Sequence, residues 1–230
     1  MGSASAADLA QTPFIDSEHP SVRAFAEDAC RETADPRERA VRLFYAVRDE
    51  VHYDPYAATA SPHGYKASTT LETRASFCIP KAILLTAAAR AVGIPARLRF
   101  ADVRNHLATD RLLSLLRTDV FVFHGLTEVQ LRGGWVKATP TFNLSLCEKF
   151  GVKPLEFDGR SDAILHPFDR LGKRHMEYLR DRGSYADLPF SEVLRAYHGA
   201  YPHLFDAHGH FLGLSRRSGD FEDEVAGESG

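Results

Sequence analysis

The segment from Pro80 to Val103 constrains the fold more than any other part of the chain. The run AILLTAAARA (82–91) consists mainly of alanine and leucine-like residues, which have high helix propensity. Pro80 suits the first turn of a helix, where its missing N–H would have no partner, and Gly93 with Pro95 ends the helix. The following ARLRFADV (96–103) is typical of a strand. The pattern predicts a helix that leads directly into a strand.

Other elements are predicted on both sides of this unit. Apolar residues recur every three to four positions after Asp35-Pro36, which indicates an amphipathic helix up to about Val51. Residues 55–74 are rich in Pro, Gly, Ser and Thr and predict a long loop. Further along we expect a short helix (107–117), the start of a strand (119–123) and a hairpin formed by 125–131 with 135–142. Short helices and loops are expected over 144–205, with HMEYLRDR (175–182) and SEVLRAYH (191–198) among the helices.

This order of elements predicts the fold class and the domain organisation. Helices that precede strands favour an α+β fold with an antiparallel sheet. No internal repeat or low-complexity linker divides the sequence, so we expect one domain over 16–212. Residues 1–15 are small and polar, and 213–230 are charged and Gly-rich, so both ends are predicted to be flexible.

Composition and charge argue against several classes of function. The 230 residues carry 28 Lys and Arg against 31 Asp and Glu, and no basic block suggests a nucleic-acid partner. The N-terminus lacks the features of a signal peptide, and no apolar run approaches the roughly 20 residues that span a bilayer, so no membrane partner is expected. Three separated cysteines do not suggest disulfides. We expect a soluble protein of bacterial-type cytoplasm, and the sequence predicts no particular oligomeric state.

Cys78 is the candidate nucleophile. It stands at or just before the first turn of the predicted helix, where backbone N–H groups and the helix dipole lower the pKa of a thiol and can stabilise an oxyanion. The alternative is that Cys78 is a small buried core residue, which is the commoner fate of a lone cysteine. Neither Cys30 nor Cys147 is followed by a proline that would mark the start of a helix, and neither belongs to a motif that contains a candidate histidine. We therefore interpret both as structural.

His124 is the candidate base, at the mouth of the predicted hairpin. A two-residue turn at Arg132-Gly133 would place residue 124 opposite 141, with 139 and 143 on the same face. Thr139, Thr141 and Asn143 could then approach the imidazole. A three-residue turn would reverse this parity.

Taken together, these segments resemble the transglutaminase-like superfamily, whose members share a papain-like fold and a Cys–His–Asp arrangement. The resemblance lies in a cysteine at a helix start that is followed by GIPAR, in a histidine that opens a strand, and in a Trp-Val phrase that ends in Pro-Thr. The corresponding segments are VRDEVHYDPY (47–56), FCIPKAILLTAAARAVGIPARLRF (77–100), HGLTEVQL (124–131) and WVKATPT (135–141). It covers residues 38–145 and leaves 146–212 as a C-terminal extension.

The resemblance implies roles for three positions. Cys78 matches the nucleophile and His124 the base, while the catalytic Asp of the family falls on Thr139. A hydroxyl can accept a hydrogen bond from the imidazole, but it carries no charge to stabilise an imidazolium. Three alternatives follow: Thr139 orients the imidazole more weakly than an Asp would, Asn143 or Asp102 takes this role, or the site is catalytically silent. Ala75-Ser76 also stand where the family has a glycine before the cysteine.

Further polar and aromatic residues are candidates for substrate binding. Arg104, Asn105 and His106 directly follow a predicted strand and could hold a substrate carbonyl or carboxylate, although a solvated loop explains them equally well. Trp135 is interpreted as core or as a wall of the acyl pocket. HPFDRLGKRHMEY (166–178) is interpreted as an extension that caps the site. HGAYPHLFDAHGH (198–210) lacks a zinc-ligand spacing, so no metal is expected.

The sequence thus predicts a thiol-dependent acyl-transfer enzyme. Cys78 would attack an amide, ester or thioester carbonyl, with hydrolysis of a peptide or amide bond as the default outcome. One alternative is transfer or Dieckmann-type cyclisation of a carrier-bound acyl chain, and another is a silent module that binds a peptide or an acyl group. The expected partner is a small-molecule, peptide or carrier-bound acyl substrate, and no cofactor is expected.

Overall fold

The computed structural model of the chain describes residues 4–132, 134–214 and 221–228. Within these residues the helices are α1 (Pro20–Ala29), α2 (Pro36–Glu50), α3 (Ala67–Thr73), α4 (Cys78–Ala91), α5 (Asp110–Leu116), α6 (Leu144–Lys149), α7 (Phe190–Ala200) and α8 (Phe221–Glu228). The strands are β1 (His52–Tyr53), β2 (Ala75–Ser76), β3 (Ala96–Asn105), β4 (Val120–Leu131), β5 (Gly134–Ala138) and β6 (Met176–Tyr185).

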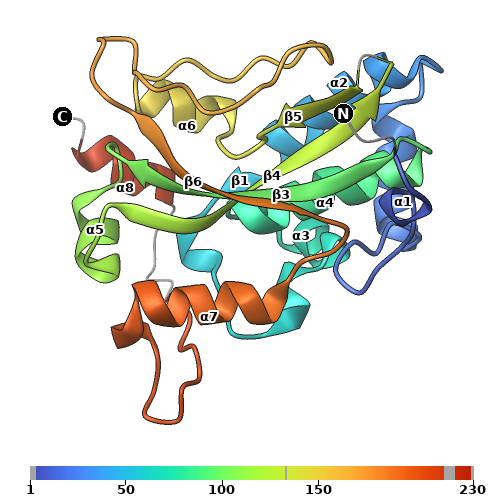
Figure 1. Cartoon of the computed structure of the whole chain (residues 1–230). Helices are drawn as coiled ribbons and strands as arrows, with labels where there is room; N and C mark the ends of the chain where they lie inside the picture. The colour runs from blue at the N-terminus through green and yellow to red at the C-terminus, as the bar shows by residue number, and fades with distance from the viewer. Residues whose placement is uncertain (1–3, 133, 215–220, 229–230) are drawn as a thin grey trace.

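Helix α4 is the central element of the core. Every residue from Ile79 to Arg90 is buried, as the sequence pattern of small and apolar residues allows. Helices α1, α2 and α3 pack against α4, and so do strands β3 and β4 (Figure 1). The predicted α+β fold, in which the helix that begins at the cysteine packs against an antiparallel sheet, is confirmed.

The main sheet has the strand order β5-β4-β3-β6, and all its neighbouring strands are antiparallel. The β4–β5 register runs from Leu131↔Gly134 to Thr127↔Ala138, which is the register of the predicted two-residue turn at Arg132-Gly133. Gly133 itself lies outside the described residues. Strands β1 and β2 form a separate short parallel pair that leads into α4.

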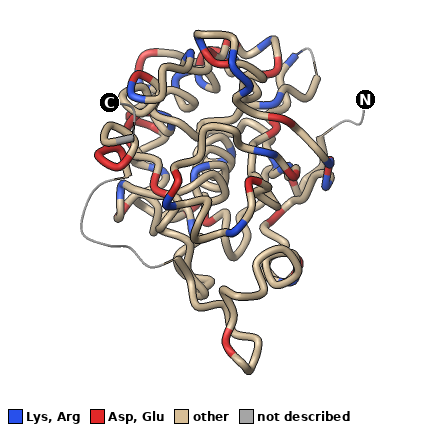
Figure 2. The backbone as a smooth tube through the Cα atoms, turned by 90° about the vertical axis from the view of Figure 1, so that its left-hand side faces the viewer, with Lys and Arg blue, Asp and Glu red and all other residues tan. Residues whose placement is uncertain are grey.

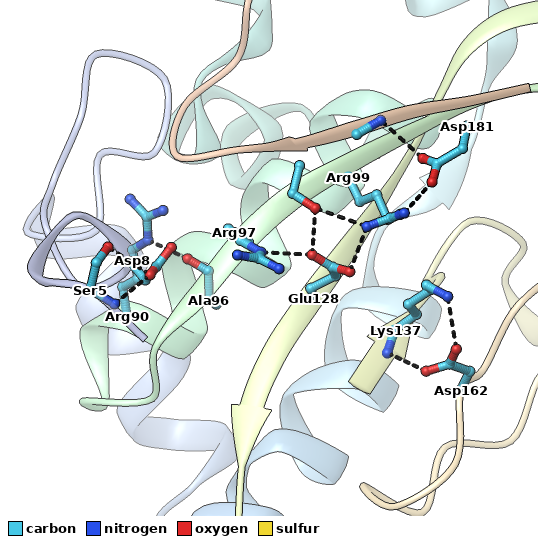
Figure 3. Close-up of polar contacts among 12 residues, drawn as sticks. Ser5, Asp8, Arg90, Ala96, Arg97, Arg99, Glu128, Lys137, Asp162 and Asp181 are labelled. Atoms are coloured by element: carbon cyan, nitrogen blue, oxygen red, sulfur yellow. Dashed lines mark hydrogen bonds and ion pairs between the residues drawn. The ribbon is translucent and has the colours of Figure 1, made fainter. Parts of the chain in front are cut away.

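The two faces of the sheet differ in polarity. Thr127 of β4 donates a hydrogen bond to the Ala82 carbonyl of α4, so the neighbouring Glu128 points to the opposite face. There Glu128 binds Arg97 and Arg99 of β3, at 2.7 and 3.1 Å, and Arg99 also pairs with Asp181 of β6 (Figure 3). This ion network joins β3, β4 and β6. The face of the sheet that points away from α4 is therefore polar at the position of the network.

Two buried cations fasten α4 to its surroundings. The Lys81 ammonium donates to the backbone carbonyls of Arg48, at 3.0 Å, and of Val51, where α2 ends. Burial lowers the pKa of Lys81 to about 7. At the other end of α4, the Arg90 guanidinium donates to the Ala96 carbonyl at 2.9 Å, which ties the helix to the start of β3. The buried side chains of Lys81 and Arg90 are therefore both hydrogen-bonded to backbone carbonyls.

Two sequence expectations about secondary structure differ from the fold. The loop expected over 55–74 contains α3, because Ala67 and Leu71 are buried and the helix packs on α4. HMEYLRDR, expected to be helical, lies in β6 from Met176 onward, because this segment pairs with β3 along its whole length. In both places long-range packing decides the structure rather than local propensity.

The flexible ends predicted for 1–15 and 213–230 fall in part on residues outside the described set. Of the described part, Ile15 is fully buried and residues 221–228 form α8. Phe221 and Val225, one helical turn apart, are buried and give this acidic segment one apolar face. The Phe221 ring meets the Tyr53 ring at a centroid distance of 5.6 Å. These segments are therefore packed against the domain.

A buried carboxylate anchors α8. Glu222 accepts hydrogen bonds from Asn143 Nδ2 at 2.6 Å and from Ser145 Oγ at 2.9 Å, and it pairs with Lys149 at 3.1 Å. Burial would raise the pKa of Glu222, but these partners together lower it to about 2. The charged form of the carboxylate thus holds α8 against α6.

The surface is of mixed charge. Lys and Arg are interspersed with Asp and Glu around the backbone in Figure 2, consistent with a net charge of −3. Within the described ranges, no helix is both long and apolar enough to cross a membrane.

The anchor of α8 gives a prediction for stability. Because the pKa of Glu222 is lower in the folded than in the unfolded chain, its contribution is present above about pH 4.5 and is lost as the pH falls toward 2. We expect Glu222→Gln to lower the free energy of unfolding at neutral pH by about 2 kcal/mol. In this variant the free energy of unfolding should also decrease less steeply as the pH falls into the acid range. Urea unfolding between acid and neutral pH measures both effects.

The matched control is Asp223→Asn, because Asp223 is exposed on the same helix. This variant should change neither the stability at neutral pH nor the acid limb. An equal loss in the two variants would contradict the anchoring role of Glu222.

Candidate active site

Cys78 is the first residue of α4, and its side chain faces a pocket. The preceding Phe77 is extended, so the chain enters the helix at the thiol. The N–H groups of Gly125 and Ile79 lie near the sulfur and favour the thiolate, but burial is the larger effect and raises the pKa of Cys78 to about 11. The residue is half-buried and lines the pocket. Cys78 is therefore a neutral thiol at neutral pH.

His124 lies on β4, opposite Ala101 of β3. Its side chain is buried, and burial lowers the pKa of the imidazole to about 4. Among the described residues, its Nε2 atom has no hydrogen-bond partner. Cys78 and His124 line the same pocket, so the structure brings the two predicted residues together as a neutral thiol and a neutral imidazole.

Gly125 allows this approach. A Cβ atom on Gly125 would lie 3.0 Å from Ile79 Cα and 3.3 Å from the Cys78 carbonyl oxygen. Both are backbone atoms of the first turn of α4, so neither can move aside without moving the helix. A glycine after His124 thus lets β4 lie directly against the start of α4.

A β-bulge precedes His124 and is held by Asp102. The β3–β4 register shifts between Ala101 and Val103, and Phe123 takes a positive φ of 58°. The Asp102 carboxylate accepts the Phe123 N–H at 3.1 Å and also binds Arg182 of β6, whose Nη2 lies 2.9 Å from Oδ2. The Arg182 guanidinium covers the Phe123 ring at 4.3 Å. Asp102, a candidate partner of the imidazole, is thus engaged in fixing the backbone before His124.

Tyr178 lies beside the imidazole, and Thr139 lies near Tyr178. Thr139 follows β5, its N–H donates to the Ala163 carbonyl at 3.0 Å, and its hydroxyl is buried. The Tyr178 ring of β6 contacts the His124 ring edge-on at a centroid distance of 6.2 Å. Burial raises the pKa of Tyr178 to about 12, while the nearby Thr139 hydroxyl acts to lower it, although no well-aligned hydrogen bond joins the two hydroxyls. None of these three side chains is a carboxylate.

Asn143, the other candidate for the third role, is occupied elsewhere. Its Oδ1 accepts the Tyr53 N–H at 3.0 Å, and its Nδ2 donates to Ser145 and Glu222. The side chain therefore joins β1 to α8.

The four predicted substrate-binding residues lie outside the pocket that contains Cys78. Arg104 pairs with Asp119 and Glu177 at 3.2 and 3.3 Å, and His106 Nε2 lies 3.6 Å from the same Glu177. Asn105 accepts the backbone N–H of Leu107 at 3.1 Å.

Trp135 pairs with Gln130, six residues along β4 from His124, which corresponds to about 20 Å of strand. Its ring is covered by the Arg97 guanidinium at 3.9 Å. Arg104 and Asn105, expected to follow the strand, are instead the last residues of β3 and pair with β6, and only His106 follows the strand.

The pocket beside Cys78 was not visible in the sequence. Its cavity volume is about 60 Å³, and its walls come from β1, α5, β4, α7 and the segment after α7. Gly125 and Tyr178 were also missed. Tyr178 falls in the segment interpreted as a cap of the site, but only its pairing in β6 brings it to His124.

Metal ligation is not supported within the described ranges, which contain no group of three or more His, Cys, Asp or Glu residues able to hold a metal ion. Cys30, Cys78 and Cys147 are free thiols, and the first and last of them are buried.

The close approach at Gly125 gives a prediction. Gly125→Ala should move β4 away from α4, lower the free energy of unfolding by about 1–3 kcal/mol and change the rate of Cys78 alkylation. Thermal unfolding and peptide mapping after iodoacetamide treatment measure the two effects.

The control is Gly199→Ala, because a Cβ atom at this position of α7 meets open space. A Gly125→Ala protein with the stability and Cys78 reactivity of the unchanged protein would contradict the role assigned to Gly125.

Comparisons with known proteins place this geometry in context. The family model of the Transglutaminase-like superfamily matches residues 23–140, which is 118 of the 230 residues. Two similar solved structures are a "putative cysteine protease" from Cytophaga hutchinsonii (TM-score 0.48, 17% identity, 81% of this chain and 48% of that one) and the periplasmic domain of TgpA from Pseudomonas aeruginosa (TM-score 0.40, 20% identity, 58% and 45%). The chain thus spans about half the length of each. The comparison with curated proteins gave no match.

Proposed function

The chain belongs to the transglutaminase-like superfamily, and from this premise we propose that it is a cysteine-dependent acyl-transfer enzyme in which Cys78 is the nucleophile and His124 the base. One observation supports the proposal most directly. The thiol at the start of α4 and the imidazole of β4 line the same pocket, and the N–H groups of Gly125 and Ile79 lie beside the sulfur.

The proposed acylation step starts from the neutral pair. As the sulfur of Cys78 attacks the substrate carbonyl, His124 accepts the thiol proton and passes it to the leaving group. The S–C bond forms, the bond between the carbonyl carbon and the leaving group breaks, and a thioester remains on Cys78. N–H groups at the start of α4 are suited to stabilise the oxyanion. Water, an amine or a carbon nucleophile then takes the acyl group and restores the thiol.

The residues around the imidazole favour esters and thioesters over amides. An amide requires protonation of its amine leaving group by an imidazolium, whereas a thiol or an alkoxide of low basicity leaves more readily. Tyr178 contacts the His124 ring and Thr139 lies near Tyr178, and neither contributes a negative charge to stabilise an imidazolium. We therefore propose an activated acyl donor, which includes acyl chains carried as thioesters, for hydrolysis, transfer or ring closure.

A second candidate function is a silent acyl-binding module. The observations that favour it are the neutral state of Cys78 and His124 and the absence, within the described part of the chain, of a partner for His124 Nε2. Such a module would hold the acyl group in the same pocket without turnover.

Trapping of the acyl-enzyme separates the two functions. With p-nitrophenyl acetate we expect one acetyl group on Cys78 by intact mass and peptide mapping, and none at this position in Cys78→Ala. His124→Ala should slow acetylation roughly 100- to 10,000-fold, because it removes the general base.

Cys30→Ala serves as the control, because it removes a buried thiol that lies outside the pocket and should leave the labelling unchanged. Equal labelling of Cys78→Ala and the unchanged protein would refute the nucleophile assignment. No labelling of the unchanged protein would favour the silent module.

A further inference from the structure

We propose that the pocket beside Cys78 binds an unbranched apolar acyl chain, so that the substrate is an aliphatic acyl ester or thioester. The proposal rests on the proposed function for the position of the reacting carbonyl. Binding of the chain itself rests on the pocket alone.

The chemistry of the pocket wall points to an apolar ligand. Among the described residues, no Asp, Glu, Lys or Arg lines the pocket. Its two ionisable groups at the reacting end, Cys78 and His124, are neutral at neutral pH because burial shifts both pKa values. A polar or charged ligand would lose its hydration without gaining an ionic partner here.

Among the aromatic residues of the wall, Phe77, Phe121 and Phe211 have no polar side-chain atom, and the hydroxyl of Tyr201 is bound to backbone groups. The Tyr201 hydroxyl donates to the Val120 carbonyl at 2.9 Å and accepts the Val122 N–H at 3.0 Å, so it is already used in holding α7 to β4. The pocket therefore offers a surface for hydrocarbon, which gains free energy in proportion to the apolar area buried.

The shape of the pocket favours an unbranched chain. Leu112 and Leu116 of α5 form one wall, and Tyr197 of α7 contributes to another. Tyr197 packs against Tyr201 and Phe211, which also line the pocket, with centroid distances of 5.7 Å in both cases, so these three aromatic residues support one another. A narrow cavity of about 60 Å³ between these walls accepts a linear chain more readily than a branched one.

Much of this wall lies outside the region that matches the family. Tyr197, Tyr201, Leu204, Phe211 and Leu214 all follow residue 140, the last residue matched. The Leu214 N–H donates to the Ala58 carbonyl at 3.0 Å, which fastens the segment after α7 to another pocket-lining residue. The C-terminal region thus adds an acyl-chain site to the shared core.

The first test measures binding without chemistry. The Cys78→Ala protein is titrated calorimetrically with acetamide, butanamide, hexanamide and octanamide, which are neutral and differ only in chain length. We expect the affinity to rise by about fourfold for each methylene group that enters the pocket. Adding Val122→Phe, which fills part of the pocket, should lower octanamide affinity roughly tenfold or more.

The control is Leu212→Phe, because Leu212 is 65% exposed and does not line the pocket. This variant should leave octanamide affinity unchanged. Octanamide that binds no more tightly than acetamide would overturn the proposal, as would equal losses in the two variants.

The second test uses the p-nitrophenyl esters of the same acids with the unmodified Cys78. In this step the sulfur–acyl bond forms, the ester bond breaks, and p-nitrophenol leaves with the thiol proton. We expect the octanoyl-to-acetyl ratio of acylation rates to exceed one and to fall in Val122→Phe but not in Leu212→Phe. If octanamide binds while no ester acylates Cys78, the acyl-chain site stands and the proposed enzymatic function fails.

Discussion

The contact between Gly125 of β4 and the first turn of α4 is the constraint on which the rest of the site depends. It seats the strand that carries His124 directly against the helix that begins at Cys78. A side chain at this position would push against backbone atoms of Ile79 and Cys78, which are fixed because α4 is buried along its length. Lys81 and Arg90 hold the helix in place through backbone carbonyls of α2 and β3. The geometry of the site is thus set by core packing, and the bulge fixed by Asp102 and Arg182 sets the backbone just before His124.

The same packing determines the electrostatics of the pair. A helix N-terminus and a neighbouring imidazolium can lower the pKa of a thiol strongly in papain-like sites. Here burial outweighs the N–H groups beside the sulfur, and burial also keeps the imidazole neutral. The Tyr178 ring contacts His124 and Thr139 lies near Tyr178, but neither side chain supplies a charge that would reverse this balance. Under the proposed function, proton transfer would accompany attack by the thiol, and an activated acyl donor would suit the site better than an amide.

The sequence predicts the parts of this structure that depend on local pattern. Helix propensity and the Gly93 and Pro95 signals locate α4 and β3, the hairpin register follows from its two-residue turn, and the family resemblance is confirmed by the match over 23–140. Features that depend on pairing between distant segments could not be predicted. Tyr178 reaches His124 only because β6 pairs with β3, and Asp102 finds Arg182 in the same way. Likewise, Trp135 and the Arg104 to His106 cluster stand near strand ends as the pattern indicates, but the register and ion pairs of the sheet place them outside the Cys78 pocket.

The pH dependence of Cys78 alkylation reports directly whether the site holds a neutral thiol beside a neutral imidazole. Iodoacetamide modification is followed at Cys78 by peptide mapping over the neutral and alkaline range. The rate should keep rising well into the alkaline range, toward the pKa of about 11 that burial gives this thiol. A rate that has already reached its plateau at neutral pH would show a preformed thiolate and would contradict the account.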